Sequence, residues 1–392
     1  MKFTFKHTIF SCFSAFIVQA TLNTFITLLF VTFQTSFHIP IEKITLLATL
    51  NFLVQLIVDL LAPQFVDRLG YRICVVASQL FAALGLVLLT ILPNFIDPFA
   101  GILTGVIVYA IGGGLIEVLI GPIMESCPTD NKEKAMSILH SFYCWGHVGI
   151  VLLSTLFFSI FGTEHWRMLT VIWALIPAFN IFMFCNVPLA SVVPEGEVGM
   201  TVGELFKTRL FWFFMMMMIC AGACEQSIVQ WVSAFAEEGL GVAKTVGDLA
   251  GPLAFAALMG AARLFYGKFG DKVPLQKFML ISSALCIVSY LLAGLANLPI
   301  INLLGCALCG FSVGIMWPGT ISQSAAALRR GGTAMFAYLA LGGDLGCSIG
   351  PSLVGFVASA ANNNMKLGIF CAVIFPIVLT ACLLLRGRKK KA

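Results

Sequence analysis

Five ionisable side chains lie inside long apolar segments of this sequence. They are Asp59, Glu117, Glu225, Arg263 and Asp344. An ionisable group inside a membrane segment costs free energy, so the groups that occur there usually have a function. A carboxyl group with apolar neighbours favours its neutral form and can gain and lose a proton at physiological pH. The chemistry predicted for these carboxyl groups is therefore reversible proton binding within a membrane.

Glu117 is the most deeply placed carboxyl group in the first half of the sequence. It lies well before the inner end of its apolar segment, about 14 Å along an α-helix. We predict that Glu117 is the proton-coupling residue and that Asp344 and Asp59 are further candidates for this role. The alternative for each is a structural carboxyl group that is hydrogen-bonded to a neighbouring helix.

Amide and aromatic side chains cluster in four of the apolar segments. Gln226 and Gln230 are four residues apart, so they lie on one helix face, and Trp231 follows them. Amides beside an indole ring suit a sugar, which needs paired hydrogen bonds and an apolar surface. The predicted substrate-binding residues are Gln19, Asn23, Glu117, Glu225, Gln226, Gln230, Trp231, Trp317 and Gln323. Hydrogen bonding between helices is the alternative for these amides.

Other residues in these segments carry structural predictions. Pro318 should kink its helix and free carbonyl groups, because proline has no N–H. Arg263 lies one turn before a charged loop, so we expect its guanidinium to reach that loop by snorkelling. Asn51, Gln55 and Asp59 are spaced by four and form a polar stripe along one helix.

The composition places these segments in a membrane. The chain has 392 residues, of which 59% are hydrophobic and only 10% are charged, whereas soluble domains are about 25% charged. Its 13 cysteines show neither metal-binding nor disulfide spacing. A spanning helix needs about 20 apolar residues. The candidate segments are 8–35, 43–66, 73–93, 98–126, 134–161, 166–189, 208–235, 247–267, 275–294, 299–327, 332–360 and 366–386.

The longest polar connection separates six of these segments from the other six. The predicted fold is therefore an all-α membrane protein with twelve transmembrane helices in two six-helix bundles. The first bundle covers 1–190, a cytoplasmic linker covers 191–207, and the second bundle covers 208–392 with a basic tail. Lys and Arg are concentrated on the side of both termini, which the positive-inside rule places in the cytoplasm. We predict a multi-pass monomer of the plasma (inner) membrane, in contact with the lipid bilayer, that binds neither nucleic acid nor a metal.

Two charged turns containing glycine recur at the same relative place in each half of the chain. The residues predicted to act as gates are Asp67, Arg68 and Arg72 in the first turn, and Gly267 and Asp271 in the second. Each turn lies between two apolar segments. The recurrence predicts a chain built twice, with Asp67 near the N-terminal end of a partner helix, where the helix dipole favours an anion.

The first turn resembles the signature loop of the major facilitator superfamily, which has the form G-x-x-x-D-R-x-G-R-R. The stretch here is PQFVDRLGYR, which departs from that form at Pro63 and Tyr71. The second turn restores the glycine and the acid at Gly267 and Asp271. The resemblance implies the major facilitator fold, in which helices 1, 4, 7 and 10 line a central cavity and helices 2 and 11 touch across the two halves.

Further stretches resemble the fucose-permease-like sugar:proton symporters of that superfamily. The run from Gly114 to Pro122 has their helix-4 form G-x-x-E-x-x-x-x-P, without the family's asparagine. The start of helix 5 is similar to theirs in its His-Ser-Phe at 140–142 and in the glycines that follow. Helix 7 has their E-x-S-x-x-x-W pattern, from Glu225 to Trp231. The resemblance implies uptake of a sugar together with protons.

Three functions follow from these observations. The first is a secondary transporter that imports a sugar or similar small polar solute by alternating access, in symport with protons and without a cofactor. The second is an exporter of drugs or metabolites with the same fold, working by proton antiport. The third is a membrane receptor that transports nothing. We expect no enzyme activity, because the sequence has no Walker loop and no credible H-E-x-x-H, G-x-S-x-G or S-x-x-K element.

Overall fold

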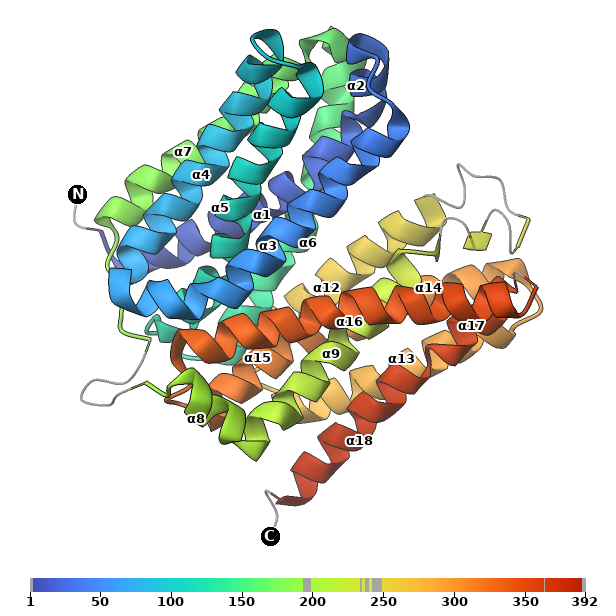
Figure 1. The fold of residues 1–392 in the computed structure, drawn as a ribbon. Coiled ribbons are helices and arrows are strands. Elements are labelled where there is room, and N and C mark those ends of the chain that lie inside the picture. Colours follow the sequence, from blue (N-terminus) through green and yellow to red (C-terminus); the bar gives the residue numbers. More distant parts are fainter. Residues whose placement is uncertain are drawn as a thin grey trace. The chain divides into compact units, whose positions relative to one another are not determined.

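A computed structural model describes residues 3–192, 199–232, 235–236, 240–241, 249–362 and 364–389. Every regular element of these residues is a helix (Figure 1). In chain order the elements are α1 (Phe5–Leu28), α2 (Phe30–Phe37), α3 (Ile41–Leu69), α4 (Tyr71–Ile91), η1 (Leu92–Asn94), α5 (Pro98–Ser126), α6 (Lys132–Phe161), η2 (Thr163–His165), α7 (Trp166–Asn186), α8 (Val202–Lys207), α9 (Arg209–Val229), η4 (Leu249–Leu253), α12 (Ala254–Phe269), α13 (Leu275–Leu295), α14 (Pro299–Val313), α15 (Met316–Ala327), α16 (Gly332–Ala360), α17 (Met365–Cys371) and α18 (Ile374–Lys389). The predicted all-α fold is confirmed.

Eleven helical stretches of the described residues are long and apolar enough to cross a membrane. The predicted segment 247–267 corresponds to the π-helical turn η4 and to α12, which has 16 residues. Pro252 lies inside η4 and removes one N–H from the helical ladder, which explains why the regular α-helix begins only after it. The start of this predicted segment, 247–248, lies outside the described residues.

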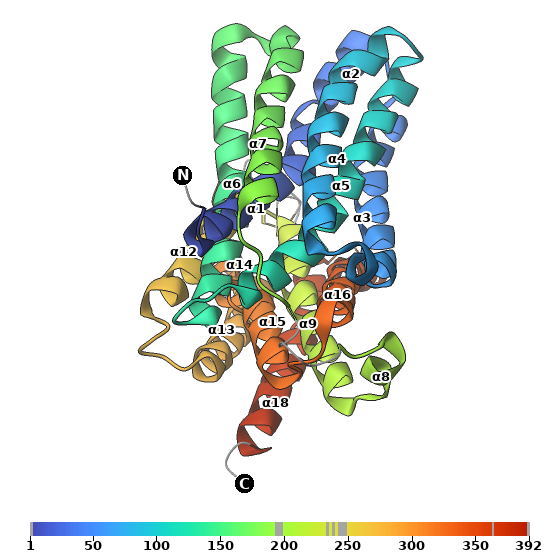
Figure 2. The same cartoon turned by 90° about the vertical axis from the view of Figure 1, so that its left-hand side faces the viewer.

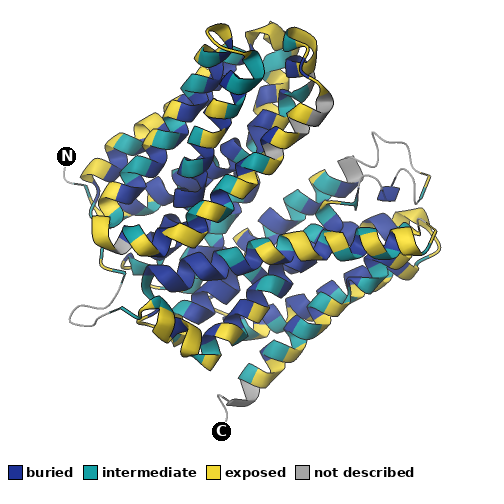
Figure 3. Cartoon of the chain, viewed as in Figure 1, coloured by how far each residue is buried: buried dark blue, intermediate teal, exposed yellow. Residues whose placement is uncertain are grey.

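Exposed apolar side chains form a stripe along single helices. On α4, Ile73, Leu80, Leu84 and Ile91 are between 43% and 60% exposed, and their spacing of seven, four and seven places them on one helix face. Figure 3 shows exposed positions along the length of the helix as well as at its ends. A water-soluble protein rarely exposes such a stripe, so this face of α4 suits contact with lipid.

The helices form two compact units. The first unit comprises Met1–Thr129, Phe142–Gly199 and Gly332–Ala337, and the second comprises Asp130–Ser141, Met200–Gly331 and Tyr338–Ala392. Within the first unit, α4 lies against α5 and α5 lies against α3 (Figures 1 and 2). Within the second unit, α14 lies against α12 and α13, and α18 lies against α9. The bundle boundaries drawn from the sequence stay a prediction, because compact units need not coincide with membrane bundles.

Glycines allow close helix contacts in the second unit. A Cβ added at Gly346 of α16 would lie 2.0 Å from the carbonyl oxygen of Ile219 in α9. A Cβ added at Gly222 of α9 would lie 2.1 Å from the carbonyl oxygen of Gly343. Because backbone oxygens cannot move aside as a flexible side chain can, α9 and α16 approach this closely only with glycine at these positions.

We expect Gly346→Ala to lower the melting temperature of the purified protein. The added methyl group forces α9 and α16 apart, and overpacking of this kind costs about 1–3 kcal/mol. Gly149→Ala on α6 is the matched control, since a Cβ there meets no atom within 4 Å. Melting is followed by intrinsic tryptophan fluorescence in detergent. Equal melting temperatures for the two variants would show that the α9–α16 contact is looser than described.

Candidate functional site

A set of hydrogen-bonded amides lies in the core of the first unit. Gln19 Nε2 donates to Gln55 Oε1 at 2.9 Å. Gln55 Nε2 donates to Asn23 Oδ1 at 2.8 Å and to Asn51 Oδ1 at 3.0 Å. Asn51 Nδ2 also donates to Asn23 Oδ1, at 3.1 Å. These four residues, which we call the amide network, join α1 to α3 because each helix repeats a polar residue after four positions.

Glu117 lies at one end of the amide network. Its Oε2 is 3.4 Å from Gln19 Nε2, within reach of a hydrogen bond. Gly113 lies one turn before Glu117 on α5, and a Cβ there would lie 3.3 Å from Gln19 Oε1 and 3.2 Å from Gln55 Cδ. Gly113 therefore leaves room for the two amides beside the carboxyl group, and a larger residue would displace them.

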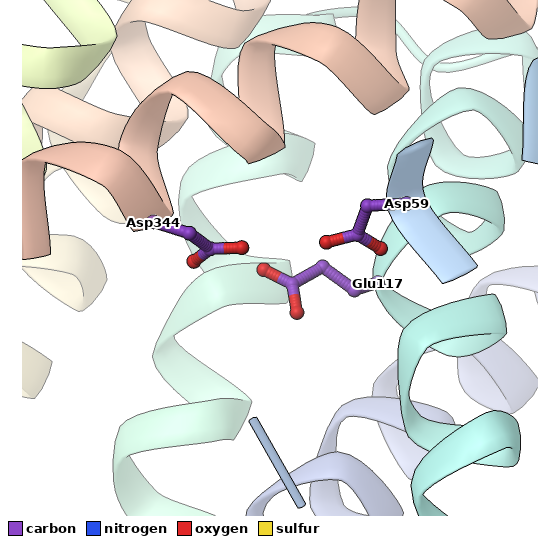
Figure 4. Close-up of side chains that lie close together, drawn as sticks. All are labelled: Asp59, Glu117 and Asp344. Atoms are coloured by element: carbon purple, nitrogen blue, oxygen red, sulfur yellow. The ribbon is translucent and has the colours of Figure 1, made fainter. Parts of the chain in front are cut away.

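Asp59 brings a second carboxyl group to the same place. Figure 4 shows Asp59, from α3, and Glu117, from α5, extending into the same region. Carboxylate oxygens of the two residues lie within 4.8 Å of each other. Asp59 is fully buried and Glu117 is half-buried. Two negative charges this close repel strongly when shielded from water, so the geometry favours protonation of one carboxyl group or a small cation bound by both.

Residues of α6 lie at the other end of the amide network. Asn23 Nδ2 is 3.5 Å from the hydroxyl of Tyr143. One residue along α1, Thr24 Oγ1 is 2.7 Å from His147 Nδ1. Sequence reasoning missed Tyr143 and Thr24, and it noted Asn51 and Gln55 only as part of a polar stripe. The i, i+4 spacing of Asn51 and Gln55 is the signal that could have identified them as site residues.

Arg263 corrects one prediction. We expected its guanidinium to snorkel toward a loop, but the residue is only 3% exposed. Its guanidinium lies 3.9 Å from Glu225 Oε2 within the second unit and donates to backbone carbonyls there. A buried cation needs compensating partners, and Arg263 finds them inside the protein. Glu225 thus has a positively charged neighbour.

The remaining predicted substrate residues of the second unit have diverse surroundings. Trp231 Nε1 donates to the carbonyl of Pro351 at 2.9 Å, which ties its ring to α16. Gln226 is half-buried, whereas Gln230, which directly follows α9, is exposed. Gln323 is 6% exposed, and its Nε2 lies 3.0 Å from the Met279 sulfur, a weak acceptor.

Two predicted residues on α15 and α16 lie in the second unit. Trp317 is half-buried, and its ring lies where a Cβ at Gly343 would meet it at 2.1 Å. Asp344 follows Gly343 on α16 and is also half-buried. Its backbone carbonyl accepts a hydrogen bond from Ser348 Oγ at 3.2 Å. Asp344 and Trp317 are thus placed on neighbouring helices of one unit.

The first predicted gate turn is only partly described. The side chain of Asp67 lies outside the described residues, and Arg68 is exposed. Arg72 donates three hydrogen bonds of 2.8–3.0 Å to carbonyl groups at the end of α7, those of Phe184, Cys185 and Val187. A cation at a helix C-terminus is favoured by the helix dipole. Arg72 therefore links the C-terminal end of α7 to the first turn by hydrogen bonds.

The second predicted gate turn contacts the start of α6 within the second unit. Asp271 accepts hydrogen bonds from Lys134 Nζ and, at 2.9 Å, from Asn131 Nδ2. Asn131 directly precedes α6, so Asp271 lies at a helix N-terminus, the position favourable to an anion. A Cβ at Gly267 would lie 2.3 Å from the Ile138 side chain. The glycine therefore permits close approach of α12 to α6.

The Asp271 contact predicts a pH dependence of stability. The hydrogen bond from Lys134, and then that from Asn131, hold the pKa of Asp271 below its usual value. Because the folded pKa is the lower one, the contact stabilises the protein above the unfolded pKa, about 3.9, and this is lost as pH falls through the folded pKa.

We therefore expect Lys134→Met to lower the melting temperature slightly at pH 7, by less than about 2 °C, because the pair is exposed. The difference from the wild type should shrink toward zero as the pH falls below about 3. Lys272→Met, in the same turn, is the control for removal of a positive charge. A difference that persists at low pH would show that Lys134 acts by packing.

Comparison with known proteins bears on the family and fold of the chain. A model of the Major Facilitator Superfamily matches residues 11–389. The membrane protein MosC of Rhizobium meliloti is 24% identical over 324 residues, which cover 82% of this chain and 76% of MosC.

Two solved structures have a similar fold. The fucose:proton symporter FucP of E. coli is 15% identical, with a TM-score of 0.82 and coverage of 97% of this chain and 98% of that one. The proton:xylose symporter XylE is 12% identical, with a TM-score of 0.74 and coverage of 96% and 94%. At such identity the likeness concerns the fold. Since the family match spans nearly the whole sequence, this chain belongs to the Major Facilitator Superfamily.

Proposed function

We propose that this protein is a secondary active transporter that moves a sugar or similar small polyhydroxylated solute across the membrane by alternating access, in symport with protons. The observation that carries the proposal is the amide network of Gln19, Asn23, Asn51 and Gln55, which ends at Glu117. Amides offer both donors and acceptors, as a solute with many hydroxyl groups requires.

Glu117 is the proposed coupling residue. Its neutral form suits the apolar surroundings of α5, and Gln19 and Asp59 lie beside it in the first unit. Binding of a proton by Glu117 removes the repulsion between the two carboxylates. If the proton binds one state of the carrier better than the other, its release resets the carrier. Asp59 and Asp344 are the further proposed proton sites.

The substrate residues proposed in the second unit are Glu225 and Gln226 near the end of α9, Gln230 and Trp231 directly after it, and Trp317 and Gln323 on α15. The side-chain oxygen Oε1 of the buried Gln323 has no hydrogen-bond partner among the described residues. A substrate hydroxyl would supply the donor that this oxygen lacks. The turns at Asp67 and Asp271 are the proposed gates. We further propose a monomer in the plasma membrane with both termini in the cytoplasm.

Uptake into proteoliposomes tests the proposal. Labelled L-fucose and D-xylose are the first probes, because two of the structurally similar proteins are symporters of fucose and of xylose. A gradient that is alkaline inside should drive accumulation of at least one sugar, and a protonophore should remove it. A sodium gradient replaces the pH gradient in the matched control.

The outcomes separate the alternatives. Accumulation driven only by an opposite pH gradient would identify a proton antiporter, and accumulation driven only by sodium would identify a different coupling ion. No transport and no binding of any sugar in a broader panel would contradict the proposed substrate class.

A further inference from the structure

Arg263 joins several helices in the core of the second unit. Its side chain extends from α12, and Nε donates to the carbonyl of Gly314 at 2.9 Å. Nη1 donates to the carbonyl of His140 at 3.0 Å, and Nη2 lies 3.9 Å from Glu225 Oε2. One cation therefore contacts the α14–α15 junction, the first part of α6, and α9.

The carbonyl of Gly314 needs this donor because of Pro318. In an uninterrupted α-helix, the carbonyl of residue 314 accepts from the N–H of residue 318, and proline has no N–H. The helix is interrupted at this point, since α14 ends at Val313 and α15 begins at Met316. The regular bonds resume with Gly319 N to Ile315 O at 2.8 Å. Arg263 Nε thus satisfies a buried carbonyl that the helix itself leaves without a donor.

The helix break also determines where Trp317 lies. Trp317 is the second residue of α15, three residues after the bonded carbonyl, and its ring packs against Gly343 of α16. The α12 backbone at Arg263 is itself held, since Ser137 Oγ donates to the Arg263 carbonyl at 2.8 Å. The orientation of α15 is therefore tied through Arg263 to α6 and α12.

We propose that Arg263 is a positioning residue for substrate recognition: it fixes the helix break at Gly314, and with it Trp317, while its positive charge compensates the nearby Glu225 carboxyl group. The recognition part rests on the proposed function, which assigns Glu225 and Trp317 to the substrate. The helix-break part stands without it. Arginine suits this role because its planar fork directs several N–H groups at once, whereas a lysine ammonium is a compact point charge.

Hydrogen–deuterium exchange of the full-length protein in nanodiscs tests the helix-break role. Arg263→Met should raise the exchange of amides in 315–323 by about tenfold or more, because the Gly314 carbonyl loses its charged donor. Arg263→Lys keeps the charge and should show a smaller rise in the same segment. Amides of α13 serve as the internal reference. Exchange within twofold of the wild type in both variants would overturn this role.

A second substitution separates the helix break from general packing. Pro318→Ala restores an N–H that can donate to Gly314, so adding it to Arg263→Met should return most of the protection of 315–323. A merely structural contribution of the arginine to packing would not be rescued in this way. Failure of the rescue, with the double variant folded, would overturn the assignment of Gly314 as the critical contact.

The charge role has its own rescue. Arg263→Met leaves the Glu225 carboxylate without its nearest described cation, so adding Glu225→Gln should raise the melting temperature relative to Arg263→Met alone. Glu225→Gln in the wild-type background is the comparison and should not raise the melting temperature, because Arg263 is still beside the carboxylate there. An unchanged or lower melting temperature on adding Glu225→Gln would overturn the charge role.

Binding of L-fucose and D-xylose measures the recognition role. Arg263→Lys should raise the Kd of the sugar that the wild type binds by about tenfold, since the arrangement of Trp317 and Glu225 is disturbed. Faster exchange of 315–323 with unchanged Kd would overturn the recognition role and leave the proposed function intact. A wild type that binds neither sugar would contradict both the recognition role and the proposed function for these sugars, while the exchange data would still decide the helix-break role.

Discussion

Glu117→Gln is expected to abolish the accumulation of substrate against a gradient and to preserve its exchange across the membrane. Glutamine resembles the protonated carboxyl group in shape and charge, so binding should survive. In the first unit the substituted side chain still lies beside Gln19 and Asp59. A permanently neutral residue cannot release a proton, and a ligand that is equally bound in both states shifts no equilibrium. In a pH gradient, the substrate concentration inside the vesicles should therefore rise no higher than the concentration outside.

The measurement compares gradient-driven uptake with counterflow exchange in the same proteoliposomes. Glu125→Gln is the matched control, because it makes the same substitution on α5 about two turns closer to the end of the helix. This control should retain accumulation. If Glu117→Gln accumulates substrate as well as the wild type does, Glu117 is not the coupling residue. Asp344, Asp59 and Glu225 would then be the remaining candidates, in that order.

Gln55→Leu is expected to weaken substrate binding by about 10- to 100-fold. Gln55 is the central member of the amide network, since it accepts from Gln19 and donates to Asn23 and Asn51. Leucine removes one hydrogen bond from each of those three amides in a buried place, and each buried group left unsatisfied costs about 1–3 kcal/mol. The freed amides then turn toward other partners, so the arrangement offered to the substrate is lost.

Gln79→Leu separates this effect from a general loss of stability. Gln79 on α4 belongs to the same unit, is fully buried like Gln55, and accepts a hydrogen bond from Asn180 at 3.3 Å. Both variants should melt at a lower temperature than the wild type, but only Gln55→Leu should raise the substrate Kd. Equal changes in Kd would show that the amide network holds helices together and does not bind the substrate.

Several features of this protein follow from the sequence alone. Hydropathy predicts the helices because a lipid environment requires every backbone group to be bonded within its own segment. The turn PQFVDRLGYR and its later counterpart indicate the family, which the match over 11–389 confirms. Pro318 predicts an interruption in its helix, and α14 and α15 are indeed separate. These features depend on neighbours in the chain, so local rules suffice.

Partner choice depends on the tertiary structure. The spacing of Asn51 and Gln55 places them on one helix face, but only the packing of α1 against α3 pairs them with Gln19 and Asn23. Arg263 lies close to a loop in sequence, yet it is buried and bonded to carbonyls far along the chain. A long side chain can reach water or the protein interior from the same backbone position, and the donors and acceptors brought near it by folding decide between them. For the same reason the sequence predicts which carboxyl groups lie in the membrane, while the fold determines that carboxylate oxygens of Asp59 and Glu117 lie within 4.8 Å of each other.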